Sequence, residues 1–303
     1  MKVRVGFGLG VTAGSGLDAD AFWEIVDTAE ALRWDSIWLS ERLSGDLVDP
    51  VAAMAAIAGR TQKLKFGPSV LVLPGRNPVV LAKELATIDV LSRGRLVVAF
   101  GLGSDFPSEH GAFGVKRSDR ASMTDEGAEL IVRLWTSEHV THHGRHFHVE
   151  DLTLLPKPVK KPFPDVWFGG HSEAAARRVG RLGTGWLPSF VAPSEYGGRV
   201  ELIKRVAAEH GREIEDDHYG ALVPYLPTPD GADRVMGAIA SRRPGVDARD
   251  IVAPDGDAGL RTLLERFVEA GATKFAVVPV TPPAHWPSEL ERLRAKVAEP
   301  LED

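Results

Sequence analysis

The chain alternates from end to end between short apolar segments and longer segments with helical periodicity. In the helical segments, apolar residues recur every three or four positions, as Phe22, Val26 and Ala29 do. Eight strand–helix units without a separating linker predict a single α/β domain over residues 1–303, a (β/α)8 TIM barrel. A doubly wound sheet is the alternative, because local patterns do not report strand order. The predicted strands are residues 3–9, 36–40, 64–73, 96–100, 166–168, 185–188, 218–226 and 274–280.

Two segments interrupt this alternation. Residues 101–119 form a polar excursion, and residues 136–164 form an insertion between the fourth helix and the fifth strand. The insertion is predicted to be a hairpin around Gly144 with a proline-stiffened return. Its histidines could ligate a divalent cation, but they flank a turn glycine, so we expect a surface hairpin and no metal site. These histidines are His142, His143, His146 and His148.

Composition excludes several classes of protein. The formal net charge of −6 argues against nucleic acid as the main partner, since nucleic-acid-binding surfaces are usually basic. Zero cysteines leave no disulfide, no thiolate metal site and no cysteine nucleophile. No apolar run approaches the roughly 18 residues that span a membrane. We therefore expect a cytoplasmic protein that acts on a small molecule.

The carboxyl ends of the predicted strands are where a barrel of this kind builds its active site. Glu41 and Arg42 follow the second strand, and Arg76 follows the third. The remaining candidates follow the fourth and fifth strands. They are Gly101, Gly103, Ser104, Asp105, Glu109 and His110 after the fourth, and Gly169, Gly170, His171 and Ser172 after the fifth.

The segment Gly169-Gly170-His171-Ser172 has the features of an anion site. A strand ends in two glycines, and a helix begins at a serine cap. Free backbone N–H groups and the helix dipole favour a phosphate at such a position. A tight turn with ordinary capping is the alternative.

Two other site types fit less well. Gly8-Leu9-Gly10-Val11-Thr12-Ala13 matches a dinucleotide-binding fingerprint, but the predicted helix begins only near Asp18, too late to receive a phosphate. A glycosidase would need two carboxylates across one cleft, and Glu41, Asp105 and Glu109 are candidates. Such barrels usually place one acid after a late strand, and the segment Pro224-Tyr225-Leu226-Pro227 at the end of the seventh strand has none.

Motifs of the third and fourth units resemble the luciferase-like monooxygenase superfamily. The resemblance rests on the run of residues 69–89, on Leu91-Ser92-Arg93-Gly94-Arg95-Leu96 and on Gly101-Leu102-Gly103. It continues through Glu109, Phe113-Gly114, Leu134-Trp135, His143-Gly144, Leu155-Pro156-Lys157-Pro158, Phe168-Gly169-Gly170 and Gly185-Trp186. These motifs occur in order across residues 1–190, whereas the last third of the chain is divergent.

The resemblance implies a barrel that binds a flavin or deazaflavin at its carboxyl end. It implies a cis peptide bond at Ser69–Val70, against which the ring rests, and a phosphate on residues 169–172. Glu41, Ser69 and Val70 would contact the cofactor, together with Gly101, Gly103, Ser104, Gly169, Gly170, His171 and Ser172.

The stretch Trp38-Leu39-Ser40-Glu41-Arg42-Leu43 resembles the branch that uses coenzyme F420. That branch transfers a hydride to or from ring carbon C5, and many members carry an acid followed by His after the second strand. Here Arg42 replaces the His, and arginine is a poor general base. We expect Glu41 to be the first candidate for proton transfer or ring hydrogen bonding, and Glu109 or His110 the second, with a solvated loop position as the alternative for His110. We expect Arg42 and Arg76 to bind substrate.

Two further functions stay open. An FMN-dependent monooxygenase would use reduced flavin and O2, and a flavin- or deazaflavin-binding protein would hold the ring without turnover. We also expect a homodimer, since relatives often dimerise.

Overall fold

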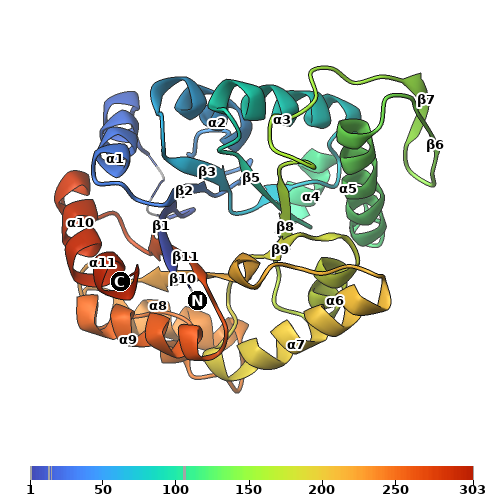
Figure 1. Cartoon of the computed structure of the whole chain (residues 1–303). Coiled ribbons are helices and arrows are strands. Elements are labelled where there is room, and N and C mark those ends of the chain that lie inside the picture. The colour runs from blue at the N-terminus through green and yellow to red at the C-terminus, as the bar shows by residue number, and fades with distance from the viewer. Residues whose placement is uncertain (1, 13, 15, 105–106, 303) are drawn as a thin grey trace.

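The structure, a computed structural model, describes residues 2–12, 14, 16–104 and 107–302, without the side chains of Pro107 and His110. Parallel strands form its centre and helices form an outer ring (Figure 1). The strands of the centre are β1 (Arg4–Leu9), β2 (Ser36–Leu39), β3 (Lys65–Pro68), β4 (Leu71–Val72), β5 (Val97–Gly101), β8 (Asp165–Phe168), β9 (Gly185–Trp186), β10 (Gly220–Tyr225) and β11 (Lys274–Pro279).

The strands close into a barrel. They form a five-stranded sheet in the order β10-β11-β1-β2-β3 and a four-stranded sheet in the order β4-β5-β8-β9. Isolated parallel bridges, Phe66 with Leu96 and Trp186 with Tyr219, join the two sheets at both seams. Because β1 pairs with both β2 and β11, the first and last strands are neighbours. The (β/α)8 class is therefore confirmed, and the doubly wound alternative is wrong.

Local sequence explains where the helices begin. Asp49 and Asn77 cap α2 and α3 by accepting hydrogen bonds from Ala52 N and Val79 N, and a proline follows each cap. The helices of the outer ring are α1 (Ala19–Ala31), α2 (Pro50–Arg60), α3 (Pro78–Ser92), α5 (Arg120–Thr136), α6 (Glu173–Leu182), α7 (Pro193–Glu209), α8 (Ala232–Arg242), α9 (Gly256–Glu269) and α10 (Trp286–Leu293). The chain also contains two short 3-10 helices (Asp216–His218 and Ala248–Asp250), a π-helix (Arg294–Ala298) and α11 (Glu299–Glu302).

The barrel interior is packed separately from the strand–helix layer. Trp38 and Trp167 lie inside the barrel with ring centroids 6.2 Å apart, among Val97, Ala99 and Leu187. Gly185 makes room for this cluster, because a Cβ there would lie 2.3 Å from the Trp167 ring. The larger cluster lies between the strands and the helices. The interior is thus a filled core that supports the carboxyl end.

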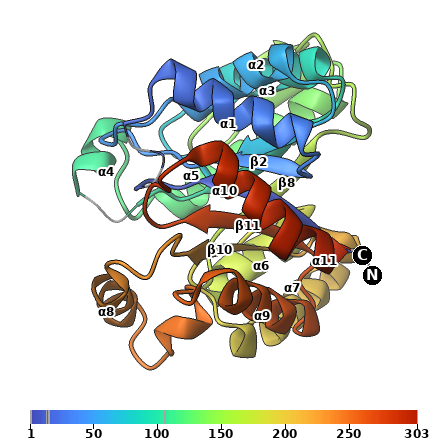
Figure 2. The same ribbon diagram turned by 90° about the vertical axis from the view of Figure 1, so that its left-hand side faces the viewer.

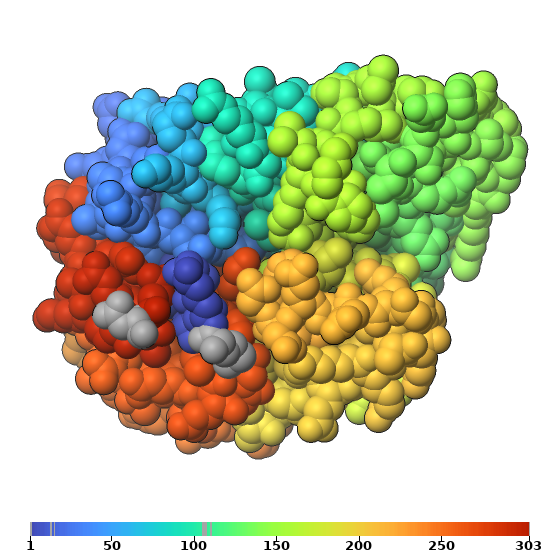
Figure 3. Space-filling model, viewed as in Figure 1, coloured from blue at the N-terminus to red at the C-terminus, as the bar shows by residue number. Residues whose placement is uncertain are grey.

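Three segments differ from, or refine, the sequence prediction. The predicted strand 64–73 is divided into β3 and β4 at Ser69–Val70. The excursion contains a short helix, α4 (Pro107–Phe113), that polar and glycine-rich sequence does not indicate. The predicted hairpin is confirmed as β6 (Val140–His143) and β7 (His148–Leu152), which project from one side of the molecule (Figure 3, green).

The two ends of the barrel are different. Both chain termini lie at one end, whereas α4 and α8 lie at the other (Figure 2). Helices α4 and α8 therefore flank the carboxyl ends of the strands. None of the helices in the described ranges is both long and apolar enough to cross a bilayer.

Candidate functional site

Two large cavities lie at the carboxyl end of the barrel. The first has a volume of about 630 Å³ and the second about 500 Å³. Both are lined by residues that follow the strands. Because they share several of these residues, the two cavities are lobes of one cleft. The residues that line both lobes are Val11, Ser40, Glu41, Ser69, Ser104 and Ser189.

The division between β3 and β4 forms the floor between the lobes. The Ser69–Val70 peptide bond is cis, as the resemblance implies. Val70 is packed against two glycines: a Cβ at Gly101 would lie 2.2 Å from Val70 Cγ2, and one at Gly169 would lie 2.9 Å from Val70 Cγ1. Ser69 Oγ is buried and has no hydrogen-bond partner among the described residues. A buried hydroxyl of this kind is suited to a ligand that supplies the missing partner.

Residues 169–172, the predicted anion site, line the first lobe next to the N-terminus of α6. The side chain of Ser172 caps α6 by accepting a hydrogen bond from Ala175 N at 3.2 Å. Gly170 has a φ of 92°, which brings the backbone to the helix N-terminus in a conformation that favours glycine. The N-terminal amides of α6 therefore face the region that residues 169–172 line.

Three arginines that are not among the residues predicted from the sequence line the same lobe. They are Arg117, Arg120 and Arg178. Arg120 donates to the carbonyl oxygen of Ser104 at 2.9 Å, and Arg178 pairs with Asp125. Their signal in the sequence is weak, because Arg120 opens α5 and Arg178 lies within α6, away from the strand ends. Their positive charge suits a phosphate or another anionic group.

His171 lines the first lobe directly before the Ser172 cap. Partial burial lowers the pKa of His171, and the nearby guanidinium of Arg243 lowers that pKa further. The imidazole is thus held in its neutral form around neutral pH, where it donates and accepts hydrogen bonds without adding charge.

Glu41 lies at the junction of the lobes. Its side chain is 2% exposed, and one carboxylate oxygen accepts a hydrogen bond from Arg76 while the other accepts one from Val72 N. Burial raises the pKa of Glu41, and the contacts with Arg76 and Val72 oppose that shift only in part. A carboxyl group with a raised pKa at the centre of a cleft is a candidate for proton transfer.

The two predicted substrate arginines are in different positions. Arg42 lines the second lobe and not the first. Arg76 lines neither lobe; besides Glu41, it contacts the carbonyl oxygen of Val72 at 3.1 Å. The structure therefore brings Arg42 to the cleft and places Arg76 behind Glu41.

Glu109 is also away from both lobes. It is 4% exposed and accepts hydrogen bonds from the amides of Leu43 and Ser44 and from the Ser44 hydroxyl. Burial raises the pKa of Glu109, but these hydrogen bonds outweigh burial, so the net pKa is below its usual range. Glu109 thus holds α4 to the loop after β2. His110 belongs to α4, and its side chain lies outside the described part of the structure, as does Asp105.

Among the described residues, Glu41 is the one carboxylate that lines the two lobes. A pair of acids across one cleft is therefore not present in that part of the chain, and the glycosidase alternative gains no support. The dinucleotide fingerprint gains none either, since α1 begins at Ala19.

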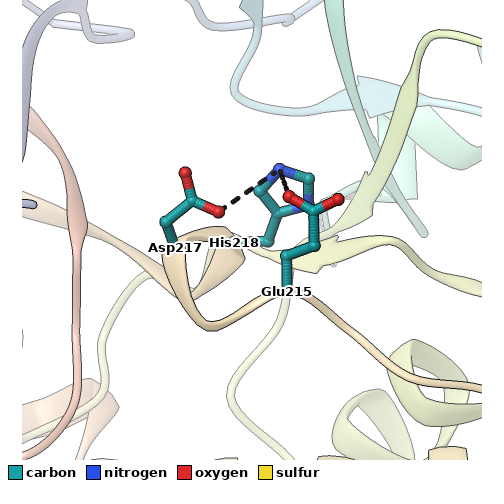
Figure 4. A group of neighbouring side chains, drawn as sticks. All are labelled: Glu215, Asp217 and His218. Carbon is teal, nitrogen blue, oxygen red and sulfur yellow. Dashed lines mark ion pairs between the residues drawn. The ribbon is translucent and has the colours of Figure 1, made fainter. Parts of the chain in front are cut away.

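The hairpin histidines have separate partners. His142 contacts Glu126 at 3.1 Å, His143 contacts Glu150 at 3.1 Å, and His146 contacts Ser122 at 2.8 Å. Within the described ranges, a three-residue group suitable for a metal occurs elsewhere, at Glu215, Asp217 and His218 (Figure 4). His218 Nε2 lies 3.8 Å from each carboxylate there, and Nδ1 contacts Thr184 O. This group precedes β10, at the barrel end opposite the cleft.

A flavin or deazaflavin fits the first lobe on its chemistry. The Val70 floor and the unpaired Ser69 hydroxyl line this lobe together with the N-terminal residues of α6 and three arginines. A planar polar ring with an anionic tail needs an apolar surface and polar groups of these kinds.

Comparison with known proteins defines the family. The family model described as luciferase-like monooxygenase matches residues 3–259. The chain belongs to the luciferase-like monooxygenase family. Its cleft residues from Val11 to Val252 all lie within the matched range, and Val278, Pro279 and Val280 lie beyond it.

Solved structures with this fold carry different cofactors. An F420-dependent secondary alcohol dehydrogenase, in complex with an F420–acetone adduct, has a TM-score of 0.82 at 20% identity, covering 100% of both chains. The oxygenating constituent of 3,6-diketocamphane monooxygenase from Pseudomonas putida, in complex with FMN, has a TM-score of 0.77 at 18% identity, covering 99% of both chains. At these identities the similarity is one of fold.

A curated relative shares more sequence. The phthiodiolone/phenolphthiodiolone dimycocerosates ketoreductase of Mycobacterium bovis (strain BCG / Pasteur 1173P2) is 27% identical over 216 residues, 67% of this chain. The aligned region spans only 56% of the length of that relative.

Proposed function

We propose that the protein is an oxidoreductase that transfers a hydride between coenzyme F420 and a small organic substrate. The observation that carries the proposal is the division of the cleft at Ser69. The first lobe has anion-binding groups for a cofactor, and the second has apolar walls for a substrate. When bound, the deazaflavin supplies or accepts the hydride at its ring carbon C5.

The residues of the chain supply binding and proton transfer. Residues 169–172, with Arg117, Arg120 and Arg178, would hold the anionic tail, and Ser69, Val70, Gly101, Gly103 and Ser104 would hold the ring. Glu41 would take the proton that leaves a substrate hydroxyl, or return it to a carbonyl oxygen, because it lines both lobes and has a raised pKa. Arg76 would keep Glu41 in place.

One structural neighbour and one sequence relative support this assignment. The F420-dependent alcohol dehydrogenase was solved with an F420–acetone adduct, and the mycobacterial ketoreductase is named for carbonyl reduction. The FMN-bound diketocamphane monooxygenase is the reason to keep an FMN-dependent monooxygenase that uses O2 as the second candidate. We further propose that the protein is a homodimer, to be tested by light scattering.

Anaerobic titration with oxidised F420 and, separately, with FMN tests the cofactor. Absorbance and fluorescence should show saturable binding of F420 and weaker binding of FMN. Tight FMN binding would favour the monooxygenase, and failure of both to bind would overturn the cofactor assignment. Binding of F420 without turnover of any alcohol or ketone would favour a binding protein.

A pair of glycine variants tests the position of the tail. Gly170→Ala puts a Cβ 2.9 Å from Ala175 Cβ at a φ of 92°, beside the α6 N-terminus. Gly211→Ala has a similar backbone cost at a φ of 66°, with no atom within 4 Å. We expect Gly170→Ala to weaken F420 binding by about tenfold, roughly 1.4 kcal/mol, and Gly211→Ala to leave it unchanged. Equal effects of the two variants would contradict an anion site at residues 169–172.

A further inference from the structure

The second lobe has an apolar wall made largely by α8 and by the ends of β10 and β11. Ile239 of α8 packs with Ala248, Ile251 and Val252 in a small cluster separate from the main core. The wall of the lobe includes parts of this cluster and the ends of β10 and β11. Its apolar members include Phe190, Leu222, Val235, Ala238, Ile239 and Val278. At about 500 Å³, the lobe is large enough for an aliphatic or alicyclic molecule.

Two arginines line this apolar lobe. Arg42 comes from the loop after β2, and Arg242 from the last residue of α8. The guanidinium of Arg242 lies 5.2 Å from the centroid of the Phe190 ring. In the part of the chain that the structure describes, Arg242 has no ion pair, whereas its neighbour Arg243 pairs with Glu195 at 2.8 Å. Arg242 therefore brings a positive charge to the lobe, and no described carboxylate neutralises it.

Arg242 gives this lobe a positive charge beside its apolar wall. The one acid among the described lining residues of the lobe is Glu41, which is already paired with Arg76 outside the lobe. The cofactor does not require the charge of Arg242, because the first lobe has arginines of its own. An apolar surface next to a positive charge recognises a molecule with an aliphatic body and an anionic group.

We propose that the substrate is an aliphatic molecule that carries an anionic group such as a carboxylate. Its body packs against α8 and the ends of β10 and β11, and its anion binds Arg242, with Arg42 on the other side of the lobe. This inference rests on the proposed function, since it takes the second lobe to be the substrate site.

The test is direct binding to the full-length protein without cofactor, so that it has a readout besides activity. Decanoate and decan-1-ol are the probes, because they share a chain length and differ in charge. Isothermal titration should give saturable binding of decanoate that is roughly fivefold tighter than that of decan-1-ol, the range of a partly exposed ion pair. Equal affinity for the two probes, or no binding of decanoate, would overturn the inference.

Matched variants of α8 locate the binding site. Arg242→Gln should weaken decanoate binding by about fivefold and leave decan-1-ol unchanged. Arg234→Gln, an exposed arginine of the same helix that does not line the lobe, should change neither. Ala238→Trp should weaken both probes by filling the lobe. If Arg234→Gln and Arg242→Gln have the same effect, the anion is bound elsewhere.

The F420 titration distinguishes failure of the proposed substrate class from failure of the proposed function. Binding of F420 together with indifference to the charge of the probe would leave the proposed function standing and remove the substrate class. Preference for decanoate without F420 binding would keep the amphipathic site and remove the hydride-transfer function.

Discussion

Glu41 and Arg76 form an ion pair beneath the cleft, and the two partners are unequally buried. The side chain of Glu41 is 2% exposed, whereas that of Arg76 is 22% exposed. Glu41 also accepts a hydrogen bond from Val72 N, so it ties the end of β2 to β4 and to the segment that follows. Loss of the arginine leaves a buried carboxylate, whereas loss of the carboxylate leaves a cation that water reaches.

Arg76→Gln should therefore lower the free energy of unfolding by about 3 kcal/mol near neutral pH, because it leaves Glu41 buried without its cation. The pKa of Glu41 is already raised by burial and will rise further in the variant. A raised pKa in the folded state costs stability as pH rises through it, so the loss should be smaller at about pH 5 than at about pH 8. Urea unfolding at both pH values measures this difference.

The double variant provides the control for that prediction. Glu41→Gln combined with Arg76→Gln removes the buried charge and should recover about half of the loss. A loss for Arg76→Gln that is the same at both pH values would contradict the burial argument.

Glu109→Gln should destabilise the protein by about 2 kcal/mol, because a charged acceptor of three hydrogen bonds becomes neutral. Since the pKa of Glu109 is lowered in the folded state, this stabilisation is present above the ordinary value of 4.5 and is lost as pH falls through the folded value. Hydrogen exchange at Leu43 and Ser44 should accelerate. Glu129→Gln, at an exposed position of α5, is the control and should change neither measurement.

Gly101→Ala should lower the free energy of unfolding by about 2 kcal/mol, because the new Cβ would lie 2.2 Å from Val70 Cγ2 and must displace it. The same variant should weaken F420 binding, since Val70 forms the floor of the first lobe. Gly59→Ala is the comparison: it lies in α2 with no atom within 4 Å and should stabilise the protein by about 0.5–1 kcal/mol. Thermal unfolding distinguishes the two directions, and a stable Gly101→Ala variant would show that the floor is not tightly packed.

Loss of the hydroxyl should lower the free energy of unfolding at one of two buried tyrosines and not at the other. Tyr225 donates to Glu289 Oε1 at 2.8 Å, so Tyr225→Phe removes a partner from a buried carboxylate and should cost about 2 kcal/mol. The hydroxyl of Tyr219 is buried without a partner among the described residues, so Tyr219→Phe should be neutral or stabilise by up to about 1 kcal/mol. Equal losses in urea unfolding would contradict this assignment of partners.

Much of the barrel follows from local chemistry. The caps at Asp49 and Asn77, the proline after each and the turn at Gly144 are properties of a few adjacent residues, and the structure confirms them. The cis peptide bond at Ser69–Val70 is predicted by the family resemblance and not by any local pattern, and the structure contains it.

The side-chain partners of the site are less predictable. Glu41 and Arg76 meet because β2 pairs with β3. Glu109 reaches Ser44 because α4, which follows β5, packs against the loop after β2. Arg178 lines the first lobe from within α6. The sequence alone predicts only that it belongs to a charged, solvent-exposed helix face. The turn at residues 169–172 could be predicted because its strand, its glycines and its helix cap are contiguous in the sequence.

Closure of the barrel has a consequence for the chain during translation. One edge of β1 pairs with β11, so that edge has no strand partner until residues 274–279 have left the ribosome. Glu302 then adds a hydrogen bond from Val5 N at 2.9 Å, next to the same edge. An unpaired strand edge is a template for pairing with another chain. The nascent protein therefore carries an aggregation-competent edge through most of its synthesis, and we expect stalled chains that lack β11 to depend on chaperones for solubility.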